Sequence, residues 1–131
     1  MARVLGIGGI FFKAKDPVAL GQWYETHLGF AIDKGTNSHM FKPAEMPQNA
    51  GTVWSVFADD TSYLEPSDRS FMFNFVVDDI RTALAQVIAA GATQVDDVVI
   101  ESYGAFAWFI DPEGNKVELW QPDLTQRADE D

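Results

Sequence analysis

The stretch FMFNFVVDDIRTALAQVIAAGA, residues 71–92, reads as a strand, an acidic cap, an amphipathic helix and a glycine. Asp79 suits the cap, because its carboxylate accepts hydrogen bonds from backbone N–H groups that the first helical turn leaves unpaired. Apolar residues then recur at helical spacing, at Ile80, Ala83, Leu84, Val87 and Ile88. Gly91 suits the left-handed conformation that ends many helices. The stretch therefore predicts a strand and a helix over about 80–90.

An earlier stretch, IGGIFFKAKDPVALGQWYETHLGF at residues 7–30, has the same order of features. Asp16 is followed by Pro17, and proline is favoured at the first helical position. Gly29 ends the helical pattern, so the spans from cap to glycine, 16–29 and 79–91, differ by one residue. This similarity at a fixed period indicates an internal repeat of two modules.

Each predicted helix is followed by room for three strands. In the second half these are about 93–99, 105–110 and 116–121, and the turn DPEGN at 111–115 joins the last two. In the first half they are about 31–35, 38–43 and 52–58, followed by a polar linker at 59–70. We therefore expect a single α+β domain of two tandem βαβββ modules, about 5–60 and 70–122, with an acidic tail at 123–131. Their sheets should form one curved mixed surface with the helices outside.

Composition restricts the possible functions. The 131 residues are 47% hydrophobic, which is typical of a folded domain, and the net charge of -11 repels nucleic acid and anionic membranes. No apolar run reaches the roughly 18 residues that cross a bilayer. The absence of cysteine excludes disulfides and thiolate metal sites. We expect a cytoplasmic protein without nucleic-acid or membrane partners.

Three motifs resemble the vicinal oxygen chelate superfamily, which includes glyoxalases, bleomycin-resistance proteins and extradiol dioxygenases. They are Asp16 with Trp23–Tyr24 and Leu28–Phe30, Val77–Ile80 with Ala89–Ala92, and the hairpin DPEGNKVEL at 111–119. The resemblance covers about residues 6–122, and the middle of the chain is similar to an uncharacterised subgroup. It implies the two-module fold and a concave groove. It also implies a divalent metal held there by one ligand from the first strand and one from the last strand of each module.

The resemblance places the four ligand positions at Gly9, Trp54, Met72 and Glu118. Glycine has no side chain, and neither indole nor thioether suits the metals that imidazole and carboxylate bind. We therefore expect no cofactor and no metal in the usual site. His39 and His27 are the candidates for a non-standard metal site, although we expect His27 to pack on the apolar helix face and His39 to lie in a solvated strand or loop.

Strand alternation places a set of mostly aromatic residues in the groove. With Glu118 facing inward, the predicted ligand-binding residues are Phe11, Trp54, Met72, Asn74, Tyr103, Phe106, Trp108 and Trp120. An apolar groove with few polar groups is typical of a small-molecule site. The same composition is also typical of a packed core or a homodimer interface.

Three functions fit these residues. The first is a binding protein that holds a small aromatic or cationic compound without a metal. The second is a lyase, isomerase or dioxygenase-like enzyme with Glu118 as the catalytic general base, or with a divalent metal bound in a non-standard way. The third is a subunit whose groove another chain fills. We expect the protein to form a homodimer.

Overall fold

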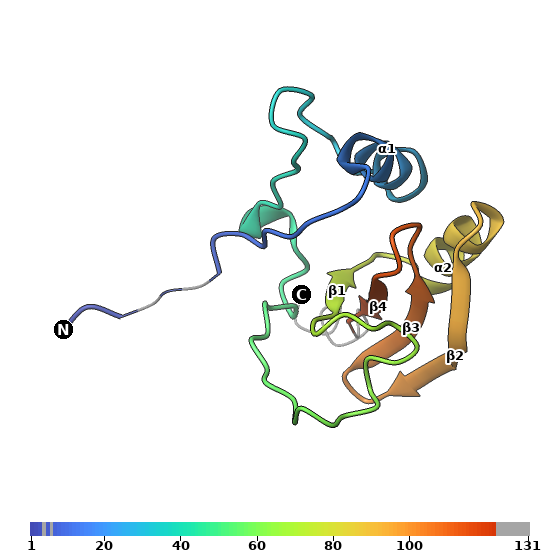
Figure 1. Ribbon diagram of the computed structural model, residues 1–131. Coiled ribbons are helices and arrows are strands. Elements are labelled where there is room, and N and C mark those ends of the chain that lie inside the picture. Colours follow the sequence, from blue (N-terminus) through green and yellow to red (C-terminus); the bar gives the residue numbers. More distant parts are fainter. Residues whose placement is uncertain (4, 6, 123–131) are drawn as a thin grey trace.

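A four-stranded mixed sheet and two α-helices form the regular structure of residues 1–3, 5 and 7–122, which the computed structural model describes (Figure 1). The helices are α1 (Pro17–Leu28) and α2 (Ile80–Ala89), with a short 3₁₀ helix η1 (Pro43–Glu45) between them. The strands are β1 (Phe73–Val76), β2 (Thr93–Glu101), β3 (Gly104–Ile110) and β4 (Lys116–Gln121). The acidic tail predicted at 123–131 lies outside the described residues.

The strand order in the sheet is β1-β4-β3-β2. β1 runs parallel to β4, and the other two pairs are antiparallel. Along β1 and β4 the register pairs Phe73 with Val117 and Asn74 with Glu118. Because successive side chains point to opposite faces, the first pair turns to the helices and the second pair turns away from them. The α+β class and the second module are therefore as the sequence predicts.

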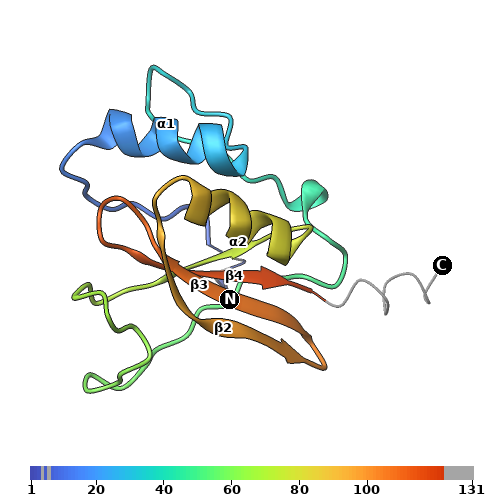
Figure 2. The same cartoon turned by 90° about the vertical axis from the view of Figure 1, so that its right-hand side faces the viewer.

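Both helices begin and end near the predicted residues. The Asp16 carboxylate accepts a hydrogen bond from the Ala19 amide at 3.0 Å, and Gly29 takes the left-handed conformation with φ of 74°. The Asp79 carboxylate accepts from the Thr82 amide. The two helices lie side by side over one face of the sheet (Figure 2). The buried side chains between helices and sheet include Leu20, Tyr24, Phe73, Ile80, Leu84, Val87, Phe109, Val117 and Leu119.

The first module differs from the prediction. Segments 7–12, 31–35, 38–43 and 52–58 form no strands in the part of the chain that the structure describes, apart from one isolated bridge between Asp33 and Ser38. The prediction of strands there is wrong for this single chain. A strand needs a neighbouring strand to satisfy its backbone groups. Among the described residues, none of these segments pairs with β1 or β2, the two edge strands of the sheet.

Asp111 joins the first module to the second. Its Oδ2 accepts the Tyr24 hydroxyl at 2.9 Å and the Asn115 side-chain amide at 3.0 Å. Its Oδ1 accepts the backbone amides of Glu113 and Asn115, both at 2.9 Å. Burial, followed by the charge of Asp111, raises the pKa of Tyr24, so its hydroxyl remains a donor. This buried carboxylate therefore shapes the hairpin turn and also fixes α1 to it.

Glu113, in the same turn, binds the chain just before α1. Its two carboxylate oxygens accept the backbone amides of Lys15 and Asp16, each at 2.9 Å. These hydrogen bonds hold the pKa of Glu113 below its ordinary value. On the other side of the turn, Ser67 Oγ donates to the Gly114 carbonyl at 2.8 Å, and Arg69 donates to the Glu113 carbonyl at 2.9 Å. One turn thus orders both the entry to α1 and the end of the linker.

Replacing Tyr24 with phenylalanine should lower the free energy of unfolding by about 1–3 kcal/mol, because Asp111 then loses a buried hydrogen-bond donor. Chemical denaturation followed by circular dichroism measures this change. Tyr103→Phe is the matched control, since the Tyr103 side chain is exposed, and should leave the unfolding free energy nearly unchanged. Equal effects of the two substitutions would contradict the role given to the Tyr24–Asp111 bond.

Candidate functional site

Glu118 lies in the middle of β4 and points away from the helices. It is paired in register with Asn74 of β1 on one side and with Trp108 of β3 on the other. Trp108 Nε1 donates to Glu118 Oε2 at 2.8 Å, and Asn74 Nδ2 donates to Oε1 at 2.7 Å. The residue is 8% exposed. The strand ladder therefore fixes a buried carboxylate between two donors on neighbouring strands.

A third donor comes from the linker between the modules. The Tyr63 hydroxyl donates to Glu118 Oε2, across 55 positions of sequence. Burial, and then the hydrogen bond to Glu118, raises the pKa of Tyr63 to about 12. The phenol is therefore protonated at neutral pH and is a donor. Three neutral donors take three of the roughly four acceptor positions of the carboxylate.

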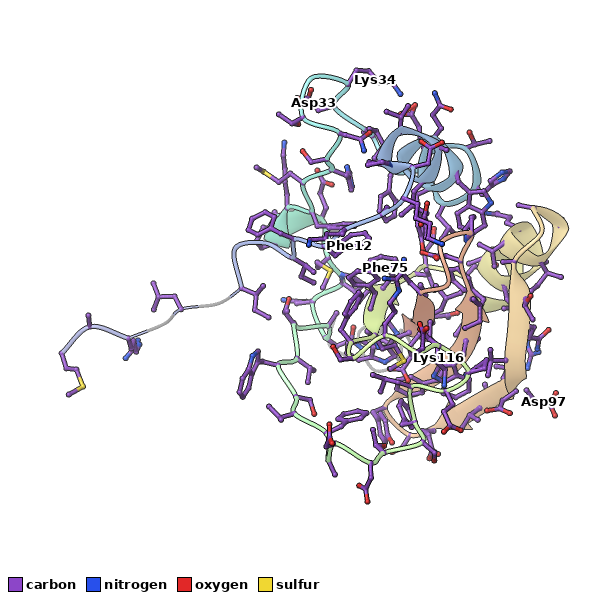
Figure 3. The ribbon with its side chains drawn as sticks, viewed as in Figure 1. Phe12, Asp33, Lys34, Phe75, Asp97 and Lys116 are labelled. Atoms are coloured by element: carbon purple, nitrogen blue, oxygen red, sulfur yellow. The ribbon has the colours of Figure 1, made fainter. Side chains whose placement is uncertain are left out.

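The charge of Glu118 is not cancelled by a direct ion pair in the described residues, where the one salt bridge joins Lys34 to Glu25 at 3.1 Å. Lys116 is the nearest cationic residue along the strand on the same face. Its ammonium donates to the Tyr63 carbonyl and lies 5.2 Å from the centre of the Tyr63 ring. Figure 3 labels the Lys116 side chain. Burial lowers the pKa of Lys116. The site thus combines a carboxylate, an ammonium group and aromatic rings.

A second aromatic group lies one step further along the same face. Phe106 pairs in register with Trp120, and their rings are parallel with centroids 6.3 Å apart. The Tyr103 ring packs edge-on against Phe106 at 5.6 Å, and the Tyr103 carbonyl accepts a hydrogen bond from Trp120 Nε1 at 3.2 Å. The rings of Phe106 and Trp120 therefore extend the apolar surface beside Glu118.

The structure gathers some of the predicted site residues and separates others. Asn74 and Trp108 contact Glu118 directly, whereas Phe11 and Trp54 lie in first-module segments and are 95% and 78% exposed. Met72 lies just before β1 and is half-buried. Sequence reasoning missed Tyr63, because it lies in a polar linker. The one sequence feature that could have pointed to Tyr63 is an aromatic residue among acidic and small residues.

The residues at the superfamily's metal positions do not fit a metal ion. Glycine, tryptophan and methionine fill three of the four positions, and the Glu118 carboxylate is occupied by three donors. In the described ranges no three histidine, aspartate or glutamate side chains gather to hold a metal. The ring of His39 packs between those of Phe30 and Phe41. His27 packs against Trp23 on α1.

A separate hollow of about 530 Å³ lies on the helix side of the sheet. It is bounded by the end of α1, by residues 41–47, by the end of β1 and by α2. Its polar lining includes Lys42, Glu45 and Asp78, all of which are exposed. This hollow therefore has no buried polar group comparable to Glu118. None of the helices in residues 1–3, 5 and 7–122 has the length and apolar character needed to cross a membrane.

Comparisons with solved structures support the fold. TnmS3, an antibiotic binding protein from Streptomyces sp. CB03234, is 21% identical with a TM-score of 0.58, and the match covers 94% of this chain and 100% of that one. A protein of unknown function from Agrobacterium tumefaciens str. C58 is 19% identical with a TM-score of 0.52, over 90% of this chain and 98% of that one.

A member of the glyoxalase/bleomycin resistance protein/dioxygenase superfamily from Sphaerobacter thermophilus DSM 20745 is 24% identical, with a TM-score of 0.34. That match spans 37% of this chain and 40% of the other chain. No curated protein matches the sequence. The model of the glyoxalase-like domain matches residues 9–120, which is most of the chain. The chain belongs to the glyoxalase-like domain family.

Proposed function

We propose that the protein binds a small aromatic compound on the helix-free face of its sheet, beside Glu118, and does so without the metal of its superfamily. The observation that carries this proposal is the buried Glu118 carboxylate, held between Trp108 and Asn74. A fixed acceptor next to flat apolar rings orients a ligand that has one polar group. The residues at the metal positions give no comparable support for a metal-dependent reaction.

The rings on this face supply the apolar contact. Trp108 lies beside the carboxylate, and the parallel pair of Phe106 and Trp120 continues the surface. Aromatic side chains provide a large contact area, and their planar faces suit planar ligands. A neighbouring structure of this fold, TnmS3, is named as an antibiotic binding protein, which supports small-molecule binding on this scaffold.

In a Tyr63→Ala background, where the chain's own phenol no longer competes for the carboxylate, Glu118→Gln should weaken binding of an aromatic ligand about tenfold, because a hydrogen bond to a charged acceptor contributes roughly 1.5–3 kcal/mol. Ligands are first selected by thermal shift from a library of phenols, anilines and benzylamines. They are then titrated by isothermal calorimetry. Selected compounds should raise the melting temperature of the wild-type protein, since a ligand that binds the folded state stabilises it.

Glu45→Gln is the matched control, because Glu45 lines the hollow on the helix side of the sheet. It should leave the affinity unchanged. Loss of binding with Glu45→Gln and not with Glu118→Gln would place the ligand in the wrong site for this proposal. A library without any stabilising member would contradict small-molecule binding itself.

A second candidate function is proton transfer by Glu118, as in a lyase or isomerase. It is favoured by a carboxylate that already accepts a phenol hydroxyl from a loop, the geometry that a general base needs toward its substrate. Exchange of an acidic C–H of a bound ligand in D₂O, followed by NMR, should then be lost in Glu118→Gln. Stoichiometric metal in protein purified without chelator would instead support a metal-dependent reaction.

We also propose that the functional form is a homodimer joined through the first-module segments that form no strands. Residues 7–12 and 52–58 carry large apolar side chains on the surface, including Phe11, Val53, Trp54 and Val56, which are 74–95% exposed. Each aromatic residue offers about 150–250 Å². Few such residues are needed to reach the ~800 Å² per partner of a standard interface. In a dimer each copy contributes the same segments, and a segment of one copy can pair as a strand with a segment of the other.

The double substitution Phe11→Asp with Trp54→Asp should convert a dimer into a monomer, because it places charge in an apolar interface. Sedimentation velocity measures the mass in solution. Val18→Asp is the control, since Val18 is 60% exposed on α1, outside these segments, and the dimer should persist. A wild-type protein that sediments as a monomer at tens of micromolar would contradict the homodimer.

A further inference from the structure

The linker between the modules brings an aromatic ring of the chain itself to Glu118. Residues 59–66 lie on the side of the sheet away from the helices (Figure 2). There the Tyr63 hydroxyl donates to the carboxylate, and the Tyr63 ring stands edge-on to that of Trp108 with centroids 6.4 Å apart. In this arrangement a phenol occupies the position where a small aromatic ligand would contact Glu118.

The three donors to Glu118 differ in how firmly they are held. Trp108 and Asn74 lie on β3 and β1, whose backbones are paired to β4 on either side of Glu118. Tyr63 lies on a connecting segment outside any helix or strand. One of the three hydrogen bonds can therefore be exchanged without disturbing the sheet. The exchangeable position is the one that a phenol hydroxyl now fills.

Displacing Tyr63 disrupts little packing. The Tyr63 side chain is 41% exposed, and residues 51–60 just before it are all exposed. Neighbouring backbone bonds, such as Glu65 to Ser62 and Thr61 to Ala58, are local turns that move with the segment. Segments with few buried apolar contacts open at low free energy. The Tyr63 ring also packs edge-on against that of Phe57, which is itself exposed, at 5.4 Å. The contacts of Tyr63 with Glu118, Trp108 and Lys116 thus fasten this part of the linker to the sheet.

Lys116 favours an aromatic ring at the position of the Tyr63 ring. Its ammonium lies 5.2 Å from the centre of that ring, a distance at which it attracts the electron-rich face of an aromatic system. A neutral ring with a hydroxyl group keeps both the attraction to Lys116 and the hydrogen bond to Glu118.

We infer that the Glu118 site takes a hydroxyl-bearing aromatic compound, which enters by displacing Tyr63 from the carboxylate. The inference rests on the proposed binding function and names its ligand class. It also makes Tyr63 the residue that sets affinity, because every ligand competes with the chain's own phenol. Removing the Tyr63 ring therefore strengthens binding of a free phenol.

The probe is p-cresol, which is the tyrosine side chain as a free molecule. Tyr63→Ala should bind p-cresol at least about tenfold more tightly than wild type, in line with the 1.5–3 kcal/mol of a hydrogen bond to a charged acceptor. The affinity for toluene, which lacks the hydroxyl, should rise much less. Tyr63→Phe is the matched variant, because its ring still fills the position. Its affinity for p-cresol should rise less than that of Tyr63→Ala.

Equal p-cresol affinities of wild type and Tyr63→Ala would overturn the inference. An increase in toluene affinity as large as that for p-cresol would also overturn it, since the substitution would then have created only an apolar cavity. In Tyr63→Ala combined with Glu118→Gln, the preference for p-cresol over toluene should fall about tenfold. An unchanged preference would place the hydroxyl on another acceptor and reject the Glu118 assignment.

A measurement on the wild-type protein tests the same point if Tyr63→Ala fails to fold. The chain has three tyrosines, so 3-fluorotyrosine labelling gives three ¹⁹F signals. Saturation with p-cresol should shift the Tyr63 signal toward that of an exposed tyrosine and leave the buried Tyr24 signal in place. If a groove ligand binds without moving the Tyr63 signal, the inference fails and the proposed function stands. If no aromatic compound binds any form of the protein, both fail.

Discussion

The buried carboxylate of Asp111 is the interaction on which the arrangement of the chain depends. Four hydrogen bonds converge on it, two from backbone amides of its own turn, one from Asn115 and one from Tyr24 of α1. A buried carboxylate that lost these donors would be costly, so the turn and α1 must be in place together. The same turn receives Ser67 and Arg69 from the linker, and the linker in turn places Tyr63. The placement of Tyr63 beside Glu118 therefore depends on polar contacts in the turn between β3 and β4.

β4 contributes alternate residues to the hydrophobic core and to the polar site. Val117 and Leu119 are fully buried among the core side chains, whereas Glu118 between them points to the opposite face. Because the core fixes its two neighbours, the carboxylate has little freedom to move. Parallel pairing with β1 and antiparallel pairing with β3 then bring one donor from each side. Packing on one face of a strand thus produces a defined polar site on the other.

The sequence predicts the features that depend on neighbouring residues and misses the contacts between distant ones. The caps at Asp16 and Asp79, the helices after them and the 111–115 turn depend on neighbouring residues, and all were predicted. The inward direction of Asn74, Trp108 and Glu118 follows from strand alternation. The Tyr63–Glu118 bond spans 55 positions and no periodicity signals it. The strands expected in the first module were wrong for this chain because their pairing depends on a partner strand, which no local pattern supplies.

The strand order has a consequence for how the protein is made. β4 sits between β1 and β3, yet it follows both of them in the chain. Until residues 116–121 leave the ribosome, β1 has no neighbour, and α1 lacks the Asp111 turn that receives Tyr24 and the Glu113 carboxylate that binds its entry. The nascent chain therefore carries an apolar helix face and several apolar segments without a sheet to cover them. The sheet cannot form completely until β4 has been synthesised, so the incomplete chain exposes apolar surface that is prone to aggregate.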